Sequence, residues 1–168
     1  MIKFIATVYF WDSFRRLSKA IYTHFAFYIG DAEPHFREQL FLSLARQCRH
    51  LSRSSHLASP GLQAITAQKG LIYSGIAIPE SDNYLAQGLE LLQVEVGKQV
   101  LPDGGHISRN PFIQLQVLRA LLEIRDALTA AHIDFPGWLE IMIKKMVPMT
   151  RALRLGDGAL ARFHGGSS

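Results

Sequence analysis

The sequence NPFIQLQVLRALLEIRDAL, residues 110–128, decides the fold class. Its leucines stand at positions 115, 118, 121, 122 and 128, a spacing that places them along one side of an α-helix. Asn110 offers a side-chain oxygen to the free amides of the first turn, and Pro111 fills a position where an N–H has no partner. The stretch therefore predicts a helix that begins at Pro111.

Helical spacing recurs along the rest of the chain. One apolar stripe contains Phe36, Leu40, Leu44, Cys48 and Leu51, and another contains Leu85, Leu89, Leu92 and Val96. No segment alternates apolar and polar residues in the manner of a strand. We predict an all-α fold of antiparallel helical hairpins, a single α-helical unit over residues 1–168, with helices at about 4–28, 35–57, 60–77, 82–100, 111–131 and 136–154.

Prolines and small polar residues mark several of the predicted helix ends. Ser59 before Pro60 repeats the capping arrangement of Asn110 before Pro111, and Ser81 is a further candidate cap. Pro148 falls inside the last predicted helix, where it removes a backbone hydrogen bond and predicts a kink.

Composition favours a globular protein with anionic partners. Of 168 residues, 48% are hydrophobic and 19% charged, and 18 Lys and Arg against 14 Asp and Glu give a net charge of +4. Cys48 is the single cysteine, so an internal disulfide is excluded. The sequence contains no HExxH motif and no Cys/His pair at metal spacing, and we expect neither metal nor cofactor.

The N-terminal sequence does not identify a compartment. The apolar run FIATVYFW, residues 4–11, is short and lacks the small residues of a signal-peptide cleavage site. No stretch reaches the roughly 18 apolar residues of a membrane span. We predict no membrane span and leave localisation and oligomeric state open.

The stretch LPDGGHISRNP, residues 101–111, combines residues that suit an anionic ligand. Arg109 presents a fork that matches a carboxylate, and His106 can donate a hydrogen bond or exchange a proton near neutral pH. The first amides of a helix that begins at Pro111 carry partial positive charge. The alternative is an ordinary turn, in which two glycines end one helix and Asn110 caps the next.

The same Asp-Gly turn occurs a second time. VLPDGGHISR and RLGDGALAR both follow a predicted helix, and Asp103 and Asp157 are 54 residues apart. The two turns are therefore predicted to lie at corresponding ends of successive hairpins, as in a helical-hairpin repeat.

Arg46, Arg49, His50 and Arg53 form a basic stripe opposite the apolar one on the same predicted helix. The stripe suits a polyanion, but such a run is also typical of a solvated helix face. No recognition motif accompanies it, so we do not expect nucleic-acid binding.

Three blocks of the sequence resemble the heparinase II/III-like family of polysaccharide lyases: SLARQCRHLSR, QVLPDGGHISRNPFIQLQVLRALLEIRDAL and IMIKKMVPMTRALRLGDGALARFHGG. They look most like a bacterial branch that carries a PDGGHxSRNP loop. The resemblance, over residues 23–166, implies an (α/α) toroid followed by a β-sandwich, and β-elimination of uronic-acid-containing acidic polysaccharide. It implies catalytic roles for His106 and Asn110, and substrate binding by Arg109, Arg46, Arg49 and Arg53.

The chain departs from this family in two respects. Some relatives carry a Tyr-His pair after the loop, where this sequence has Ile113 and Gln114, so a catalytic base must come from elsewhere. The sequence also ends before any β-sandwich, so we expect an incomplete toroid with little activity alone. The alternative is a non-catalytic helical module that binds a polyanion or a protein partner.

Overall fold

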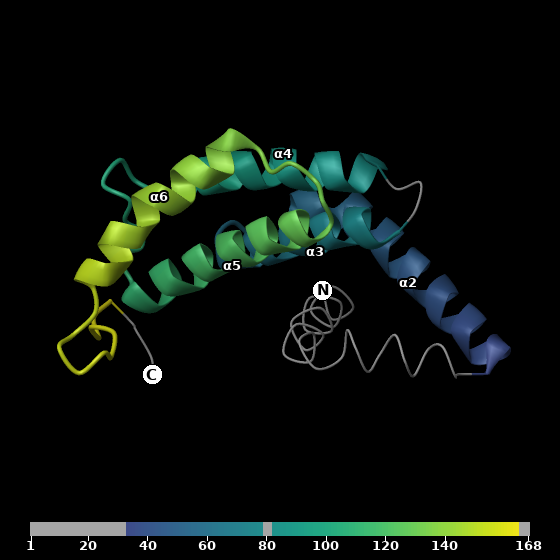
Figure 1. Ribbon diagram of the computed structural model, residues 1–168, viewed down its shortest axis with the longest axis horizontal. Helices are drawn as coiled ribbons and strands as arrows, with labels where there is room; N and C mark the ends of the chain where they lie inside the picture. Colours follow the sequence, from purple (N-terminus) through teal and green to yellow (C-terminus); the bar gives the residue numbers. More distant parts are fainter. Residues whose placement is uncertain (1–32, 79–81, 165–168) are drawn as a thin grey trace. The chain divides into compact units, whose positions relative to one another are not determined.

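A computed structural model describes residues 33–78 and 82–164, and this part of the chain is all-helical (Figure 1). It contains no β-strand, only two isolated bridges between single residues. The all-α prediction is confirmed, while the predicted helix at 4–28 and the candidate cap Ser81 lie outside the described residues. The elements are α2 (Pro34–Ser54), a 3-10 turn (Ser55–Leu57), α3 (Leu62–Ala77), α4 (Asp82–Gln99), α5 (Pro111–Ala130) and α6 (Gly137–Ala152).

The chain divides into two compact units, and the first, residues 1–55, is described through α2. Of the described side chains in the apolar stripe predicted on this helix, those toward its C-terminal end are buried. Cys48 and Leu51 are each 1% exposed, whereas Phe36 is 58% exposed. The thiol of Cys48 is therefore buried.

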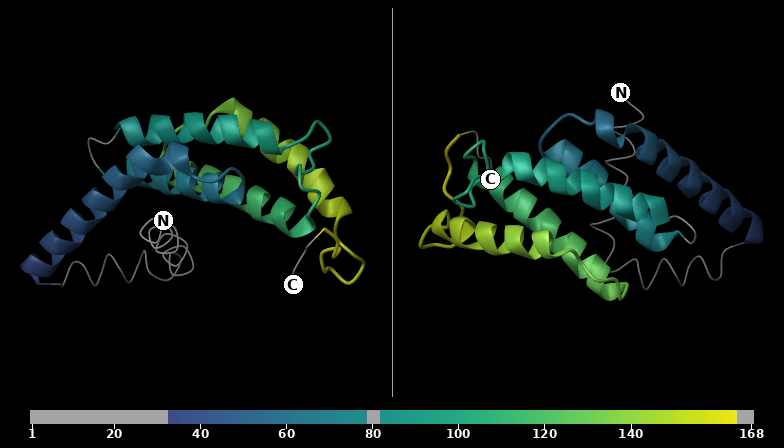
Figure 2. Two further views of the ribbon diagram at one scale, coloured as in Figure 1. Left: turned by 180° about the vertical axis from the view of Figure 1, so that it is seen from behind. Right: turned by 90° about the horizontal axis from the view of Figure 1, so that it is seen from above.

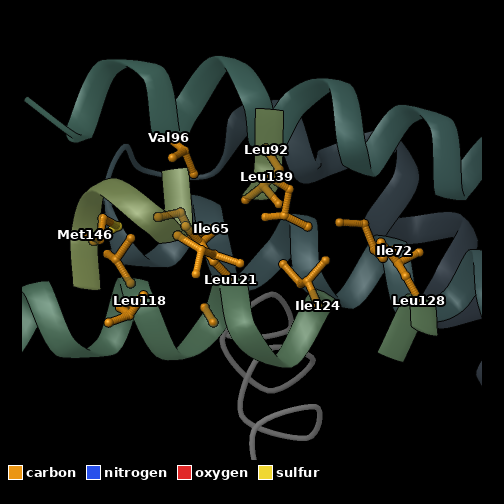
Figure 3. Packing of buried hydrophobic residues seen from close by; sticks show 13 residues of the cluster. Ile65, Ile72, Leu92, Val96, Leu118, Leu121, Ile124, Leu128, Leu139 and Met146 are labelled. Atoms are coloured by element: carbon orange, nitrogen blue, oxygen red, sulfur yellow. The ribbon is translucent and has the colours of Figure 1, made fainter. Parts of the chain in front are cut away.

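The second unit, residues 56–168, holds the main hydrophobic core. Helix α3 packs against both α4 and α5, and α5 packs against α6. Apolar side chains from all four helices meet between them (Figure 3), and the fully buried ones include Ile65, Ile72, Leu92, Val96, Leu121, Ile124, Leu128, Leu139 and Met146. Burial of this area is the principal stabilising contribution to the unit.

The four helices of this unit alternate in direction. Helices α3 and α5 run one way and α4 and α6 the other (Figures 1 and 2). The connection from α4 to α5 and the segment that follows α6 consequently lie at the same end of the unit. A hydrogen bond of 2.8 Å from Asn110 Nδ2 to the carbonyl of His164 joins these two segments.

The predicted side-chain cap is present at the start of α5 and absent at the start of α3. Asn110 caps α5, as predicted, because its Oδ1 accepts from the amides of Phe112 and Ile113. The predicted Ser59–Pro60 cap is wrong, since α3 begins at Leu62 after Gly61 at φ +102°. The amide of Gly61 donates to Glu95 Oε1 at 2.7 Å. A buried carboxylate from α4, and not the side chain of Ser59, therefore accepts a backbone hydrogen bond at the start of α3. Helix α6 continues through Pro148, and the predicted kink stays a prediction.

Candidate functional site

The connection between α4 and α5, residues 100–110, is a compact turn that we call loop 1. Val100 and His106 form an isolated antiparallel bridge, and the amide of Leu101 donates to the carbonyl of Gly105 at 2.9 Å. Gly104 lies in the left-handed region at φ +81°, where a side chain would be strained. A Cβ added to Gly104 would also overlap the carbonyl of Lys145 on α6. The backbone of loop 1 is therefore pressed against α6.

An exposed ion pair crosses loop 1. Asp103 accepts from Arg109 Nη1 at 2.6 Å and from the amide of Gly105 at 2.9 Å. The bond from Arg109, and then that from Gly105, holds the pKa of Asp103 below its usual value. Roughly half of each charged side chain remains exposed, 47% for Arg109 and 45% for Asp103. Arg109 thus binds the carboxylate of Asp103 at a position that is open to solvent.

His106 is buried within loop 1, and its ring nitrogens both have partners. Nδ1 accepts from the amide of Ser108 at 3.1 Å and lies 2.8 Å from the Ser108 hydroxyl. Because Nδ1 accepts from a backbone N–H, the ring proton resides on Nε2, which donates to Gln99 Oε1 at 3.0 Å. Burial lowers the pKa of His106, so the ring is neutral at pH 7.

The hydrogen bonds of His106 continue into α4 and α3. Gln99 donates through Nε2 to Glu95 Oε1, which also accepts from the amide of Gly61. Gln99 is 4% exposed and Glu95 is 8% exposed, so the chain of bonds is removed from water. It ties loop 1 to the start of α3 through buried polar side chains.

Gln114 is the second buried anchor of loop 1, and it is 1% exposed. Its Oε1 accepts from the amide of His106 at 2.6 Å. Its Nε2 donates to the carbonyl of Gly104 at 3.0 Å and to Thr150 Oγ1 at 3.2 Å. One side chain on α5 therefore fixes two backbone groups of loop 1 and joins them to α6.

The residues predicted from sequence fall into two groups. His106, Arg109 and Asn110 all lie in loop 1. The side chains of His106 and Asn110 form hydrogen bonds within the fold, and that of Arg109 is partly exposed. Arg46, Arg49 and Arg53 lie exposed on α2, in the other unit of the chain. Their roles in binding stay predictions.

Gln99 and Glu95 were not singled out from the sequence, and Gln114 was noted only as a departure from the family pattern, not as a structural anchor. Gln114 occurs on the buried side of α5, three and seven residues before Val117 and Leu121. A polar residue within an apolar stripe is a signal that it has buried hydrogen-bond partners. That signal was available, but the identity of the partners was not.

The segment after α6, residues 153–164, repeats the geometry of loop 1, and we call it loop 2. Arg154 and Leu160 form an isolated bridge, as Val100 and His106 do 54 residues earlier. The amide of Leu155 donates to Ala159, matching the bond from Leu101 to Gly105. Gly158 at φ +85° and the Asp157 turn match their loop 1 counterparts. The two Asp-Gly turns therefore share one geometry, while the helical-hairpin repeat predicted from them stays a prediction.

Two further properties of the described residues bear on chemistry. They contain no cluster of three or more His, Cys, Asp or Glu side chains arranged to hold a metal ion. None of their helices is long and apolar enough to cross a membrane.

Comparison with known proteins identifies a family. A model of the heparinase II/III N-terminus matches residues 12–166. FtsZ-localized protein C from Caulobacter vibrioides is 34% identical over 129 residues, which cover 77% of this chain. The chain spans 22% of the length of that relative. No solved structure matches.

The match to the heparinase II/III N-terminus extends over most of the chain and includes both loops and all the described helices. It begins at residue 12, whereas the resemblance seen in the sequence was given over residues 23–166. This chain belongs to the heparinase II/III N-terminal family.

Proposed function

We propose that this chain forms part of an (α/α) toroid in a heparinase II/III-like protein, and that loop 1 holds a carboxylate of a uronic-acid-containing glycan. The observation that carries the proposal is the Asp103–Arg109 pair. Arg109 is exposed, already orients its guanidinium toward a carboxylate, and lies on a loop that buried side chains hold in place. A uronate carboxylate can take the place of Asp103 in this pair.

The reaction of the whole protein would be β-elimination. A base removes the proton on the carbon next to the carboxylate, the bond to the glycosidic oxygen breaks, a carbon–carbon double bond forms, and the departing oxygen receives a proton. A cation at the carboxylate stabilises the negative charge that develops there. Arg109 is suited to this role, and we place the base outside loop 1, because His106 Nδ1 faces Ser108 and is unavailable to a ligand.

The test uses a longer protein of which this chain is part. It is incubated with a panel of uronic-acid polymers, and unsaturated products are followed by their ultraviolet absorbance. We expect product from at least one polymer, and a lower rate in Arg109→Ala. Arg119→Ala is the control, because Arg119 is also an exposed, ion-paired arginine but lies along α5 outside the loop. Absence of product from every polymer contradicts the lyase proposal.

A second candidate is a non-catalytic module that binds a polyanion or a protein partner. The observation in its favour is that the polar atoms of His106, Asn110 and Gln114 are engaged within the fold. The name of FtsZ-localized protein C describes that relative as localized with FtsZ, and we extend to the present chain, as a proposal, the binding of a protein partner.

Substitution of the basic stripe on α2 tests this second candidate function. Salt-sensitive binding of an acidic glycan by the 168-residue chain is expected to be lost when Arg46, Arg49 and Arg53 are all replaced by alanine. A triple variant that removes Arg119, Arg125 and Lys144 loses the same charge elsewhere and serves as control. Equal weakening in both variants shows that only net charge matters and contradicts a site on α2.

A further inference from the structure

The aspartates of loop 1 and loop 2 have the same role in their turns. Asp103 accepts from the amide of Gly105 at 2.9 Å, and Asp157 accepts from the amide of Ala159 at 2.9 Å. An aspartate that accepts from the amide two residues later stabilises a turn by itself. Among the described residues Asp157 takes part in no salt bridge, so the turn forms in loop 2 without an arginine.

Loop 1 differs from loop 2 because its aspartate also binds an arginine. Arg109 Nη1 donates to Asp103 Oδ2 at 2.6 Å, while Asp103 Oδ1 serves the turn. Phe163 stands 54 residues after Arg109 and cannot form such a pair in loop 2. The ion pair is therefore an addition to the turn and not a requirement of it.

The glycine at position 105 leaves room for the guanidinium group. Gly105 does not have a positive φ, so its backbone conformation does not require glycine. A Cβ added there would lie 2.6 Å from Arg109 Nη1, which is too close for a side-chain carbon. The corresponding residue of loop 2 is Ala159. Glycine at position 105 thus allows Arg109 to lie over the turn and reach Asp103.

Loop 1 also fixes the backbone of Arg109. Its φ is +52°, in the left-handed region that few residues with a side chain adopt. Its amide donates to the carbonyl of His106 at 2.9 Å, and the ring of His106 is bonded to the buried Gln99. The carboxylate of Asp103, six residues earlier, is therefore held within reach of the guanidinium.

An anion from solution has to displace this neighbouring carboxylate before it can bind Arg109. Asp103 belongs to the same fixed loop, so it competes at a high effective concentration. Displacement lowers the affinity of every anion by the same factor. A single small anion exchanges one exposed ion pair for another and gains little, whereas an oligomer that is held by further contacts can still bind.

We propose that Asp103 is an internal competitor at the anion site of Arg109. Its carboxylate occupies the guanidinium in the absence of ligand, keeps single small anions out, and yields to an anionic oligomer that makes further contacts. In one respect we rely on the proposed function, in which Arg109 is the residue that receives the ligand anion. Asp103 then sets the affinity threshold of that site.

The test titrates inorganic sulfate and a short oligouronate, in separate experiments at constant ionic strength, into the 168-residue chain. The side-chain Nε–Hε signal of Arg109 is followed by NMR and is identified by its absence in Arg109→Ala. We expect Asp103→Asn to bind sulfate at least about fivefold more tightly than wild type. Asparagine keeps an oxygen that can accept from the amide of Gly105 but carries no charge, so the turn should be preserved.

Asp157→Asn is the matched control, because it removes the same charge from the same turn in loop 2. It should bind sulfate within about twofold of wild type. Equal sulfate affinity in Asp103→Asn and wild type, or an equal gain in Asp157→Asn, overturns the internal competitor.

The oligouronate separates this proposal from the glycan proposal. Since displacement of Asp103 costs the same for either probe, its removal should raise both affinities by a similar factor. If Asp103→Asn gains sulfate affinity while neither protein binds the oligouronate, the competitor is supported and the uronate ligand is wrong. If wild type binds the oligouronate at Arg109 and Asp103→Asn binds it no better, the competitor is wrong and the uronate ligand stands.

Discussion

At the scale of single residues, Gln114 determines the conformation of loop 1. Its side chain forms hydrogen bonds with four groups. Oε1 accepts from the amide of His106, and Nε2 donates to the carbonyl of Gly104, the hydroxyl of Thr150 and the carbonyl of Met146. A buried polar group that loses its partner is costly, about 1–3 kcal/mol for each group. Gln114 is therefore a structural anchor of loop 1.

Gln114→Met tests this interpretation, because methionine has similar size and shape but cannot donate or accept in the same way. We expect the free energy of unfolding, measured with urea, to fall by about 2–4 kcal/mol. Gln116→Met, two residues along α5 and partly exposed, should change it by less than about 0.5 kcal/mol. Similar changes in both variants would show that Gln114 does not anchor the loop.

His106 makes the stability of the fold depend on pH. Burial lowers its pKa in the folded state below the unfolded value of 6.5, so the unfolded chain binds the proton more readily. Stability from this residue is therefore present above about pH 6.5 and is lost as pH falls toward the folded pKa.

We predict that the free energy of unfolding decreases between about pH 7.5 and pH 5.5, and that the decrease is smaller in His106→Asn. The other six histidines are common to both proteins, so the difference in slope reports His106. Parallel curves for wild type and variant would contradict a buried neutral imidazole.

At the scale of elements, the helices were predictable because their signals are local. Apolar residues at helical spacing and the Asn110 cap lie within a few residues of the structure that they specify. The start of α3 was mispredicted because it depends on Glu95, which is 34 residues away in sequence. The bond from Gln114 to Thr150 spans 36 residues, and nothing in the local sequence identifies that partner.

The repeated loops provide a matched pair of substitutions. Gly104 and Gly158 have nearly the same positive φ, so alanine at either position introduces left-handed strain of about 1–2 kcal/mol. Only at Gly104 does the new Cβ also overlap a backbone carbonyl, that of Lys145. At Gly158 the nearest atom is the flexible end of Arg154, 3.4 Å away.

Thermal unfolding should therefore show a larger loss of stability for Gly104→Ala than for Gly158→Ala, by more than about 1 kcal/mol. The excess measures how tightly loop 1 is pressed against α6. Equal losses would mean that only the backbone conformation matters and that the contact with α6 is loose.

At the scale of the whole molecule, the family match shows which fold family the chain belongs to, and the structure shows which loop residues are exposed. Membership in the heparinase II/III N-terminal family rests on a match over residues 12–166. The described residues add a specific feature, an exposed arginine on a loop that two buried glutamines hold. Our proposal therefore assigns the contact with a glycan carboxylate to Arg109, which is exposed, rather than to His106 or Asn110, whose side chains are hydrogen-bonded within the fold.

The most direct test of this claim is a binding titration of a short oligouronate by the 168-residue chain at low salt. Arg109→Ala should weaken binding about tenfold, whereas Arg119→Ala, which removes an equally exposed charge from α5, should leave it nearly unchanged. If the two variants bind the oligouronate equally, or if wild type does not bind it at all, loop 1 does not hold a uronate carboxylate.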